Sequence, residues 1–151
     1  MLYIASDHAG FELKKKIKSF LKSIDINFVD IGPLKYDAQD DYPDFIIPAA
    51  EKVGKNPSKN KAIILGKSGQ GEAIAANKVK GVRAALYYGG PKDILLLSKT
   101  HNNTNIISIG TSFINEKELF KAIQTWLKAS FSKEKRHVRR IKKITNYENK
   151  K

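Results

Sequence analysis

Residues 62–78 read AIILGKSGQGEAIAANK, a short apolar run followed by a glycine-rich loop and a helix pattern. Gly66, Gly69 and Gly71 would let the backbone approach a ligand closely, and Glu72 follows where the helix begins. A strand, a glycine loop and a helix N-terminus in this order direct backbone N–H groups outward, toward an anion or an oxyanion. A tight turn without a ligand would use the same residues, so the loop alone leaves both interpretations open.

Three familiar glycine motifs do not fit this loop. A P-loop requires a glycine where this chain has Lys61, although Gly66-Lys67-Ser68 matches the end of that motif. A nucleophile elbow requires a glycine where this chain has Gln70. The dinucleotide fingerprint G-x-G-x-x-G is also absent, because the glycines fall at 66, 69 and 71. The loop therefore indicates an anion-binding backbone, and its sequence does not identify the ligand.

Strand and helix patterns alternate along the whole chain. The strands are short continuous apolar runs, as expected for strands that are buried on both faces. The predicted strands are 2–6, 26–32, 62–65, 82–88 and 105–110, and the predicted helices are 10–24, 44–53, 71–79, 91–99, 115–127 and 132–146. In the first helix the lysines are expected on the face opposite the apolar residues. This alternation predicts an α/β fold: a doubly wound, Rossmann-like, five-stranded parallel sheet with helices on both faces.

Length and composition suit one domain, residues 1–151, in which about 130–151 form a basic helix and tail. No apolar run approaches the roughly 20 residues that span a bilayer, and the N-terminus does not resemble a signal peptide. The chain has no cysteine, which excludes disulfides, thiolate nucleophiles and cysteine–zinc sites. These features predict a cytoplasmic protein.

The chain carries 28 Lys and Arg against 15 Asp and Glu, a net charge of +13. From Lys128 onward there are ten basic and two acidic residues, so the tail supplies most of the excess. Such an excess suggests nucleic acid as a partner, while a solvated basic face is the simpler interpretation. No aromatic and basic RNA-binding motif accompanies it, which argues against nucleic acid.

Polar side chains follow three of the predicted strands. Asp7 and His8 follow the first strand, residues 40–42 (Asp-Asp-Tyr) lie in the loop after the second, and the glycine loop follows the third. Ligands of such sheets bind at the carboxyl ends of the strands, so these residues are expected to lie together. His101 precedes the fifth strand instead, and strand order alone does not bring it to this edge.

Five motifs together resemble one family, the type B ribose-5-phosphate isomerases, which are grouped with the galactose-6-phosphate isomerase subunits. They are SDHAG (6–10), DYP (41–43), GKSGQGEAIAANK (66–78), HNNTN (101–105) and RHVRR (136–140), and they occur in the family's order from Ser6 to about Ile144. The resemblance implies an aldose–ketose isomerase that moves a proton between C2 and C1 through an enediolate, with no metal and no organic cofactor.

The resemblance also implies which residue is the base. Many members of the family have a cysteine at the position of Gly66, and another branch has a glutamate at the start of the following helix. Glu72 falls on that glutamate. Backbone N–H groups around Ser68 would stabilise the enediolate. The helix N-terminus favours the charged carboxylate and burial opposes it, so the sequence leaves the direction of the pKa shift open.

The remaining site residues take their roles from the same resemblance. His101 would help to open the sugar ring, His8 would lie at the phosphate end, and Arg136 and Arg140 would bind the phosphate held by a neighbouring subunit. Plain structural roles are the alternatives: a strand end for Asp7 and His8, a helix end for His101, packing for Tyr42 and a solvated face for the arginines. The assigned residues are catalytic Glu72, His101 and Ser68, and substrate-binding Asp7, His8, Tyr42, Gly66, Lys67, Gly69, Gly71, Asn102, Arg136 and Arg140.

Two positions depart from the family pattern. Ser112 stands where members often carry a phosphate-binding arginine, and Lys67 replaces a small residue of the loop. We expect ribose 5-phosphate as the substrate, with a six-carbon aldose phosphate (galactose or allose 6-phosphate) or a non-catalytic sugar-phosphate-binding relative as alternatives. The expected assembly is a homodimer, with a tetramer as the alternative, and no membrane partner.

Overall fold

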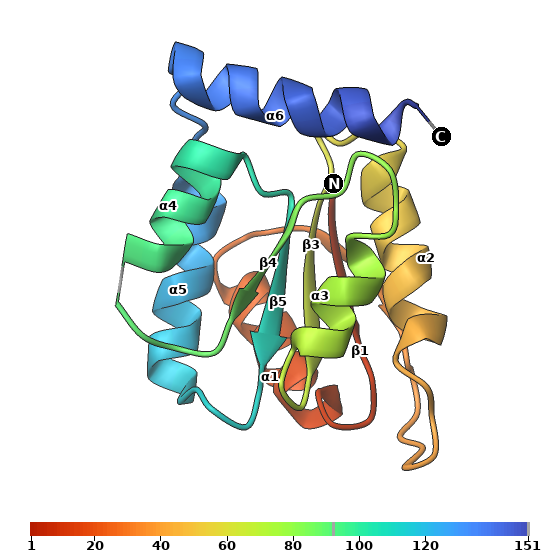
Figure 1. The fold of residues 1–151 in the computed structure, drawn as a ribbon. Helices are drawn as coiled ribbons and strands as arrows, with labels where there is room; N and C mark the ends of the chain where they lie inside the picture. Colours follow the sequence, from red (N-terminus) through yellow and green to blue (C-terminus); the bar gives the residue numbers. More distant parts are fainter. Residues whose placement is uncertain (92, 151) are drawn as a thin grey trace.

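The structure, a computed structural model, describes residues 1–91 and 93–150. Lys92, within the predicted helix 91–99, and Lys151, at the end of the predicted tail, lie outside the described residues. Strands and helices alternate as predicted (Figure 1). The strands are β1 (Leu2–Ser6), β2 (Phe28–Gly32), β3 (Lys61–Gly66), β4 (Ala84–Tyr87) and β5 (Ile106–Gly110). The helices are α1 (Phe11–Ser23), α2 (Pro43–Gly54), α3 (Gln70–Ala76), α4 (Asp93–Asn102), α5 (Glu116–Lys128) and α6 (Lys135–Glu148).

The five strands form one sheet in the order β2-β1-β3-β5-β4, and every neighbouring pair is parallel. The chain moves from β1 to one side of the sheet and from β3 to the other, so the winding reverses between these two strands. Ser6 pairs with Leu65 at this point, immediately before Asp7 in one segment and Gly66 in the other. Loops that leave the carboxyl ends of β1 and β3 diverge here, which is where open α/β sheets bind ligands.

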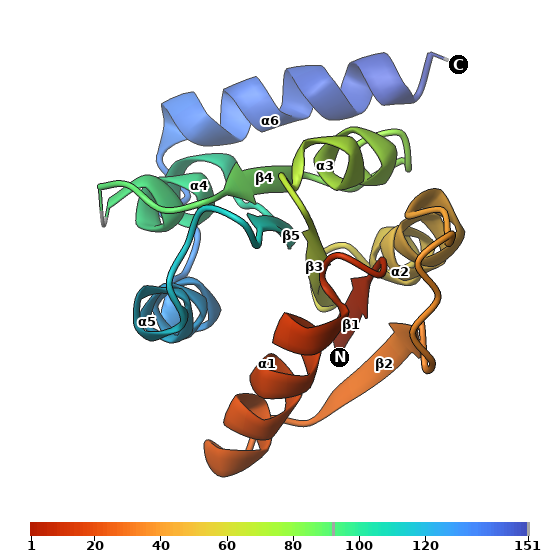
Figure 2. The same cartoon turned by 90° about the horizontal axis from the view of Figure 1, so that it is seen from below.

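Helices cover both faces of the sheet, which confirms the doubly wound architecture (Figure 2). On one face the core includes Ile17 and Leu21 of α1, Leu95 of α4 and Trp126 of α5. On the other face, residues of α2 and α3 such as Ile46 and Ala76 pack against the sheet. The interior strand β5 is buried along its whole length, whereas the edge strand β2 is mostly half-buried. Burial on both faces explains why the central strands are continuous apolar runs.

One expectation for α1 is wrong. Lys14 does not lie on a solvated face, because its side chain is buried at 1% exposure. Its Nζ donates hydrogen bonds of 2.8 Å to Oδ1 of Asp30 and of 2.8 Å to the carbonyl oxygen of Pro33. Asp30 belongs to β2. The Asp30 carboxylate and the Pro33 carbonyl take the place of water around the buried Lys14 ammonium, as the burial of a charge requires. Lys14 thereby ties α1 to the start of the loop 33–42.

The basic helix α6 crosses the end of the molecule at which the strands begin (Figure 1). Its one buried residue is His137, while Val138 and Ile144 are 45% and 52% exposed. The helix therefore makes little apolar contact with its own domain. Among the described residues, no helix has both the length and the apolar character that a membrane span requires.

Candidate functional site

Asp7 and His8 leave the carboxyl end of β1 and are fixed there by hydrogen bonds. Oδ1 of Asp7 accepts the Gly10 N–H at 3.0 Å, and Asp7 is only 7% exposed. His8 is held by Asp40 from the loop after β2: its backbone N–H donates to Asp40 Oδ1 at 3.0 Å, and its Nδ1 lies 2.6 Å from the same oxygen. The loops after β1 and β2 are thus joined at the edge where the sequence predicts the site.

The glycine loop after β3 is joined to β5 through its backbone. Gly69 adopts a left-handed conformation with φ of 74°, and its carbonyl accepts a 2.6 Å hydrogen bond from the buried Ser108 hydroxyl. A Cβ atom on Gly69 would lie 2.9 Å from the backbone of Gly110, so glycine is required for the close approach as well as for φ. The Ser112 N–H donates to the carbonyl of Lys67 at 3.1 Å. These close backbone contacts with β5 explain why the loop needs glycine at position 69.

Glu72 lies in the first turn of α3 and is buried at 4% exposure. A Cβ atom on Gly66 would lie only 1.8 Å from Oε1 of Glu72, so the carboxylate occupies the volume of the side chain that Gly66 lacks. Burial raises the pKa of Glu72, the charge of Asp7 raises it further, and the backbone N–H of Glu72 itself opposes the shift. The desolvation effect therefore exceeds the effect of this backbone hydrogen bond. A buried carboxylate of raised pKa is suited to accept and return a proton near neutral pH.

Tyr42 closes one side of this group. A Cβ atom on Gly71 would lie 2.9 Å from Cζ and 3.0 Å from the hydroxyl oxygen of Tyr42, so the ring rests directly on the first turn of α3. The missing side chain at Gly71 is what makes room for the phenol. The predicted residues that come together at the carboxyl ends of β1 and β3 are Asp7, His8, Tyr42, Gly66, Lys67, Ser68, Gly69, Gly71 and Glu72.

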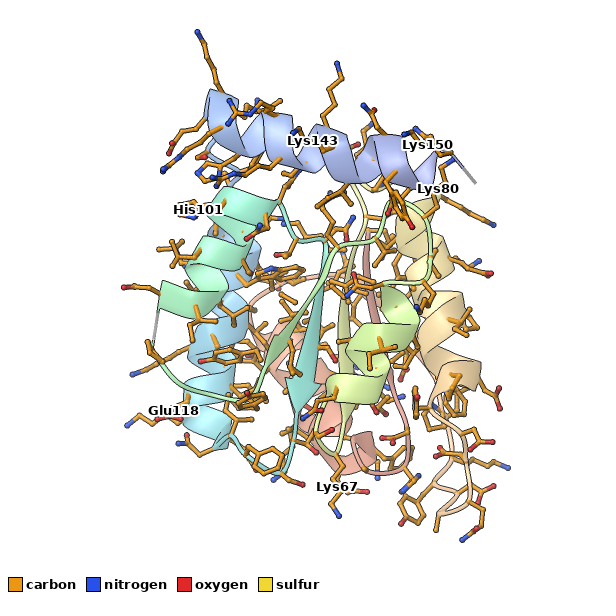
Figure 3. All side chains as sticks on the ribbon, viewed as in Figure 1. Lys67, Lys80, His101, Glu118, Lys143 and Lys150 are labelled. Atoms are coloured by element: carbon orange, nitrogen blue, oxygen red, sulfur yellow. The ribbon has the colours of Figure 1, made fainter. Side chains whose placement is uncertain are left out.

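Four predicted residues do not join this group within one chain. His101 and Asn102 end α4, and Arg136 and Arg140 lie on α6. Figure 3 shows His101 beside α6 and Lys67 at the opposite end of the molecule. The separation follows from topology, because a helix that connects two parallel strands runs back toward their amino ends. The sequence interpretation that His101 needs a reason beyond strand order to join the site is confirmed.

His101 is instead attached to α6. Its ring stacks on the ring of His137, with 4.2 Å between centroids and 14° between planes. His137 is buried at 4% exposure, and its Nε2 has no hydrogen-bond partner among the described residues. Burial lowers the pKa of His137, with the charge of His101 acting in the same direction. His101 and the arginines of α6 therefore form one unit, the amino-end cluster: His101, Asn102, Arg136, His137 and Arg140.

Two of these contacts were not anticipated from the sequence. Asp40 was seen only as one of two adjacent acidic loop residues, and nothing in the pattern distinguished it from Asp41. His137 lies between Arg136 and Arg140 in the sequence, and nothing in the pattern assigns it a partner. Both contacts join residues more than 30 positions apart, which no local pattern reveals. Among residues 1–91 and 93–150, no cluster of three side chains of metal-ligating type occurs.

The sequence matches known proteins over nearly its whole length. Residues 2–144 match the family model described as ribose/galactose isomerase. A Mycoplasma genitalium protein named probable ribose-5-phosphate isomerase B is 44% identical over 97% of this chain and 95% of its own. Ribose-5-phosphate isomerase B of Mycobacterium tuberculosis is 41% identical, over 97% of this chain and 89% of its own.

Solved structures agree with these sequence matches. The crystal structure of ribose-5-phosphate isomerase B from Mycoplasma genitalium with bound ribulose 5-phosphate has a TM-score of 0.94 at 43% identity, and the match covers 99% of this chain and 97% of that chain. Ribose-5-phosphate isomerase B of Clostridium thermocellum has a TM-score of 0.90 at 36% identity, over 99% and 97% of the two chains. Since the family model spans residues 2–144 and the two sequence relatives are 44% and 41% identical over nearly the whole chain, this chain belongs to the ribose/galactose isomerase family.

Proposed function

We propose that this protein interconverts ribose 5-phosphate and ribulose 5-phosphate, with Glu72 as the base. One observation carries the proposal: a buried carboxylate stands at the switch point of the sheet, in the space beside Gly66, with its pKa raised by burial. An aldose–ketose isomerase needs one group that removes a proton from carbon and returns it to the neighbouring carbon. Family membership over residues 2–144 supports the same reaction class.

The proton transfer follows from this geometry. The Glu72 carboxylate removes the proton from C2 of the open-chain aldose, and the electrons of that bond place negative charge on the carbonyl oxygen at C1. The proton of the 2-hydroxyl then moves to O1, and Glu72 returns its proton to C1, which leaves the carbonyl at C2. N–H groups and the hydroxyl of the loop around Ser68 stabilise the enediolate, because they are fixed before charge develops.

The residues around Glu72 bind the rest of the substrate. Asp7 accepts hydrogen bonds from sugar hydroxyls, and the Tyr42 ring forms a wall of the site. His8 and Lys67 supply positive charge for the phosphate group. Lys67 lies beside Ser112, whose N–H bonds its carbonyl, so it brings a cation next to the place where the family arginine is missing.

The site is completed by the amino-end cluster of a partner subunit. Within one chain this cluster lies at the opposite end of the sheet, and α6 presents its basic residues to solvent. Arg136 and Arg140 of the partner subunit would bind the phosphate, since forked guanidinium donors match its oxygens. His101 stacks on α6, so the partner that supplies the arginines also supplies His101 for ring opening and Asn102 for substrate contact. A two-fold homodimer then contains two shared sites.

A cytoplasmic location suits this function, because charged sugar phosphates are retained inside the cell and do not cross a bilayer unaided. The residues that surround Glu72 need no metal or organic cofactor for the proton transfer described here. The basic tail has a role in binding the substrate phosphate, which removes the need for nucleic acid as its partner.

The test is turnover of a panel of aldose phosphates: ribose 5-phosphate, allose 6-phosphate and galactose 6-phosphate. We expect ribose 5-phosphate to have the highest kcat/KM, and the Glu72→Gln variant to lose about 10²- to 10⁴-fold in kcat while it still binds substrate. A preference for a six-carbon phosphate would change the substrate but keep the base. Binding without turnover of any sugar in the panel would contradict the enzyme assignment, and a folded Glu72→Gln protein of normal kcat would contradict the base.

A further inference from the structure

Asp40 makes a two-point contact with His8 that none of the proposed catalytic steps has used. The same carboxylate oxygen, Oδ1, accepts the His8 backbone N–H at 3.0 Å and lies 2.6 Å from His8 Nδ1. The Asp40 side chain is 7% exposed, and its other oxygen, Oδ2, is buried without a hydrogen-bond partner among the described residues. The pair joins the end of β1 to the loop after β2, across 32 positions of the chain.

This contact decides which nitrogen of the ring faces a ligand. An ionised carboxylate can only accept hydrogen bonds, so the short contact places a hydrogen on Nδ1. Nε2 lies across the ring from Nδ1, on a side chain that is 36% exposed. Tyr36 of the same loop approaches the His8 ring edge-on, with 6.5 Å between centroids and 86° between planes. The loop 33–42 thus contacts the imidazole from two sides, and Asp40 binds it through Nδ1.

We propose that Asp40 is a positioning residue that keeps His8 protonated on both nitrogens, so that Nε2–H donates to the phosphate group of the substrate. The inference rests on the proposed function for the identity of the ligand, and it concerns Asp40, to which no role has been assigned. A phosphate monoester is mostly dianionic above about pH 6. A neutral ring with its hydrogen on Nδ1 would present a lone pair to that dianion, whereas the cation presents a donor and a charge.

The charges around His8 favour the cation. The hydrogen bond to Asp40 raises the pKa of His8 above its ordinary value; burial opposes the shift, and the charge of Asp7 supports it. The buried Lys14 of α1 also interacts with the charge of Asp40. In the proposed dimer, Arg136 and Arg140 of the partner subunit would oppose the protonation of His8. The Asp40 carboxylate offsets these cations and the charge of Lys67, and it lets His8 remain as a further positive group at the phosphate.

Fold stability alone gives no reason for a carboxylate at this position. A buried oxygen without a hydrogen-bond partner destabilises a folded protein. Asn at position 40 could still accept the His8 backbone N–H through Oδ1, so the loop does not depend on the charge. What asparagine cannot supply is the negative charge that holds the second proton on the ring. The role of the carboxylate is therefore to keep His8 doubly protonated.

The experiment compares Asp40→Asn with the control variant Asp41→Asn in the assembled protein. Asp41 is exposed and next in the chain, so the control removes the same charge without the contact. The chain has three histidines, and the resonance of His8 is identified as the one lost in a His8→Gln variant. In NMR titrations of the free protein, the pKa of His8 should fall in Asp40→Asn and stay near the wild-type value in Asp41→Asn. An unchanged His8 titration in Asp40→Asn would overturn the proposal.

The second readout is KM for ribose 5-phosphate as a function of pH. At pH 8, KM should be about fivefold higher in Asp40→Asn than in wild type, with kcat much less affected, and the two KM values should converge near pH 6. In a His8→Gln background, Asp40→Asn should add no further increase. A pH-independent loss of kcat, or an equal increase in KM with and without His8, would overturn the positioning role. The titration needs no turnover, so a shifted His8 pKa in a protein that isomerises no sugar would mean that the proposed function has failed and the Asp40–His8 coupling has not.

Discussion

The carboxylate of Glu72 occupies the space that a side chain on residue 66 would fill. A Cβ atom on Gly66 would lie 1.8 Å from Oε1 and 2.1 Å from Cδ of Glu72. Gly66 has no left-handed backbone conformation, in contrast to Gly69, so the carboxylate and not φ is what requires glycine at this position. Residues 66 and 72 are therefore alternatives: the end of β3 has room for a side chain from one of them.

The first prediction tests this exclusion with a double-mutant cycle. Gly66→Ala should lower the free energy of unfolding by about 1–3 kcal/mol, as overpacking does, because the methyl group displaces the carboxylate. Glu72→Ala removes the group that clashes, so Gly66→Ala should cost much less in that background. Thermal or denaturant unfolding of the four proteins measures the coupling. The same cost in both backgrounds would show that Gly66 is required for some other contact.

The second prediction concerns the acid limb of the pH–activity profile. Glu72 acts as a base only when ionised, so kcat/KM should fall as the pH decreases through its raised pKa. The limb should therefore lie above 4.5, the ordinary value for glutamate. Asp7→Asn removes a charge that raises this pKa, so the limb should move to lower pH even though turnover is weaker. Initial rates across the acid range measure both positions, and a wild-type limb at or below 4.5 would contradict the desolvated base.

The third prediction is recovery of activity in mixed dimers. One parent carries Glu72→Gln, and the other carries Arg136→Ala together with Arg140→Ala, so each parent alone should be nearly inactive. Random exchange in equal amounts makes about half the dimers mixed, and each of these has one intact site of two. Roughly a quarter of the normal activity should return.

The matched control for this experiment mixes Glu72→Gln with Asp7→Asn. Both residues belong to the carboxyl-end half of the site, so a mixed dimer has no intact site and the activity of the mixture should stay at the average of the two parents. Recovery in both mixtures would indicate a different division of the residues. Failure of the arginine mixture after verified exchange would mean that the base and the arginines act within one chain.

The fourth prediction concerns stability and Lys99. This side chain is 6% exposed, and its Nζ donates to the carbonyl of Thr104 at 2.6 Å beside the ring of Trp126. Burial lowers its pKa from 10.5 to about 8. Between these values the unfolded chain binds more protons than the folded one, so folding stability should rise with pH from about 8 toward 10.5.

Comparison with Lys99→Met isolates this effect, because other groups titrate alike in both proteins. From pH 7 to pH 10, the difference in unfolding free energy should move in favour of the wild type by about 2 kcal/mol. The exposed Lys117→Met should show no such trend. Urea denaturation at several pH values makes the measurement, and parallel curves for wild type and Lys99→Met would contradict a depressed pKa.

The local sequence pattern was sufficient to predict the strands, the helices and the part of the site at the carboxyl ends of the strands. The apolar runs and glycine breaks predicted every strand and helix to within a few residues, since burial on both faces leaves continuous runs. Asp7, Ser68 and Glu72 were predicted together because parallel strands share one carboxyl edge. The helix ends were less accurate: α3 ends at Ala76 instead of Val79, and α6 begins at Lys135 instead of Ser132.

Contacts between distant segments were not predictable in the same way. The buried position of Lys14 depends on Asp30 from β2, and a run of lysines in a helix resembles a solvated face whatever lies opposite it. The Asp40–His8 pair and the His101–His137 stack likewise depend on which loops and helices meet. A sequence contains such pairs without indicating which members approach each other.

The arrangement of α6 has a consequence for hydrogen exchange. Asp7 directly follows β1, and Glu72 lies in the first turn of α3, a few residues after β3. The amides of these two interior strands should exchange only on global unfolding. The helix α6 buries His137 alone and is fastened near its ends, by the Ser132 N–H to Thr100 and the Gly81 N–H to Glu148. In an isolated chain its amides should exchange through local opening, long before those of the sheet. In the proposed dimer, the base would then lie next to the most slowly exchanging strands of one subunit, while the phosphate would be held by a segment of the other that can detach without unfolding either domain.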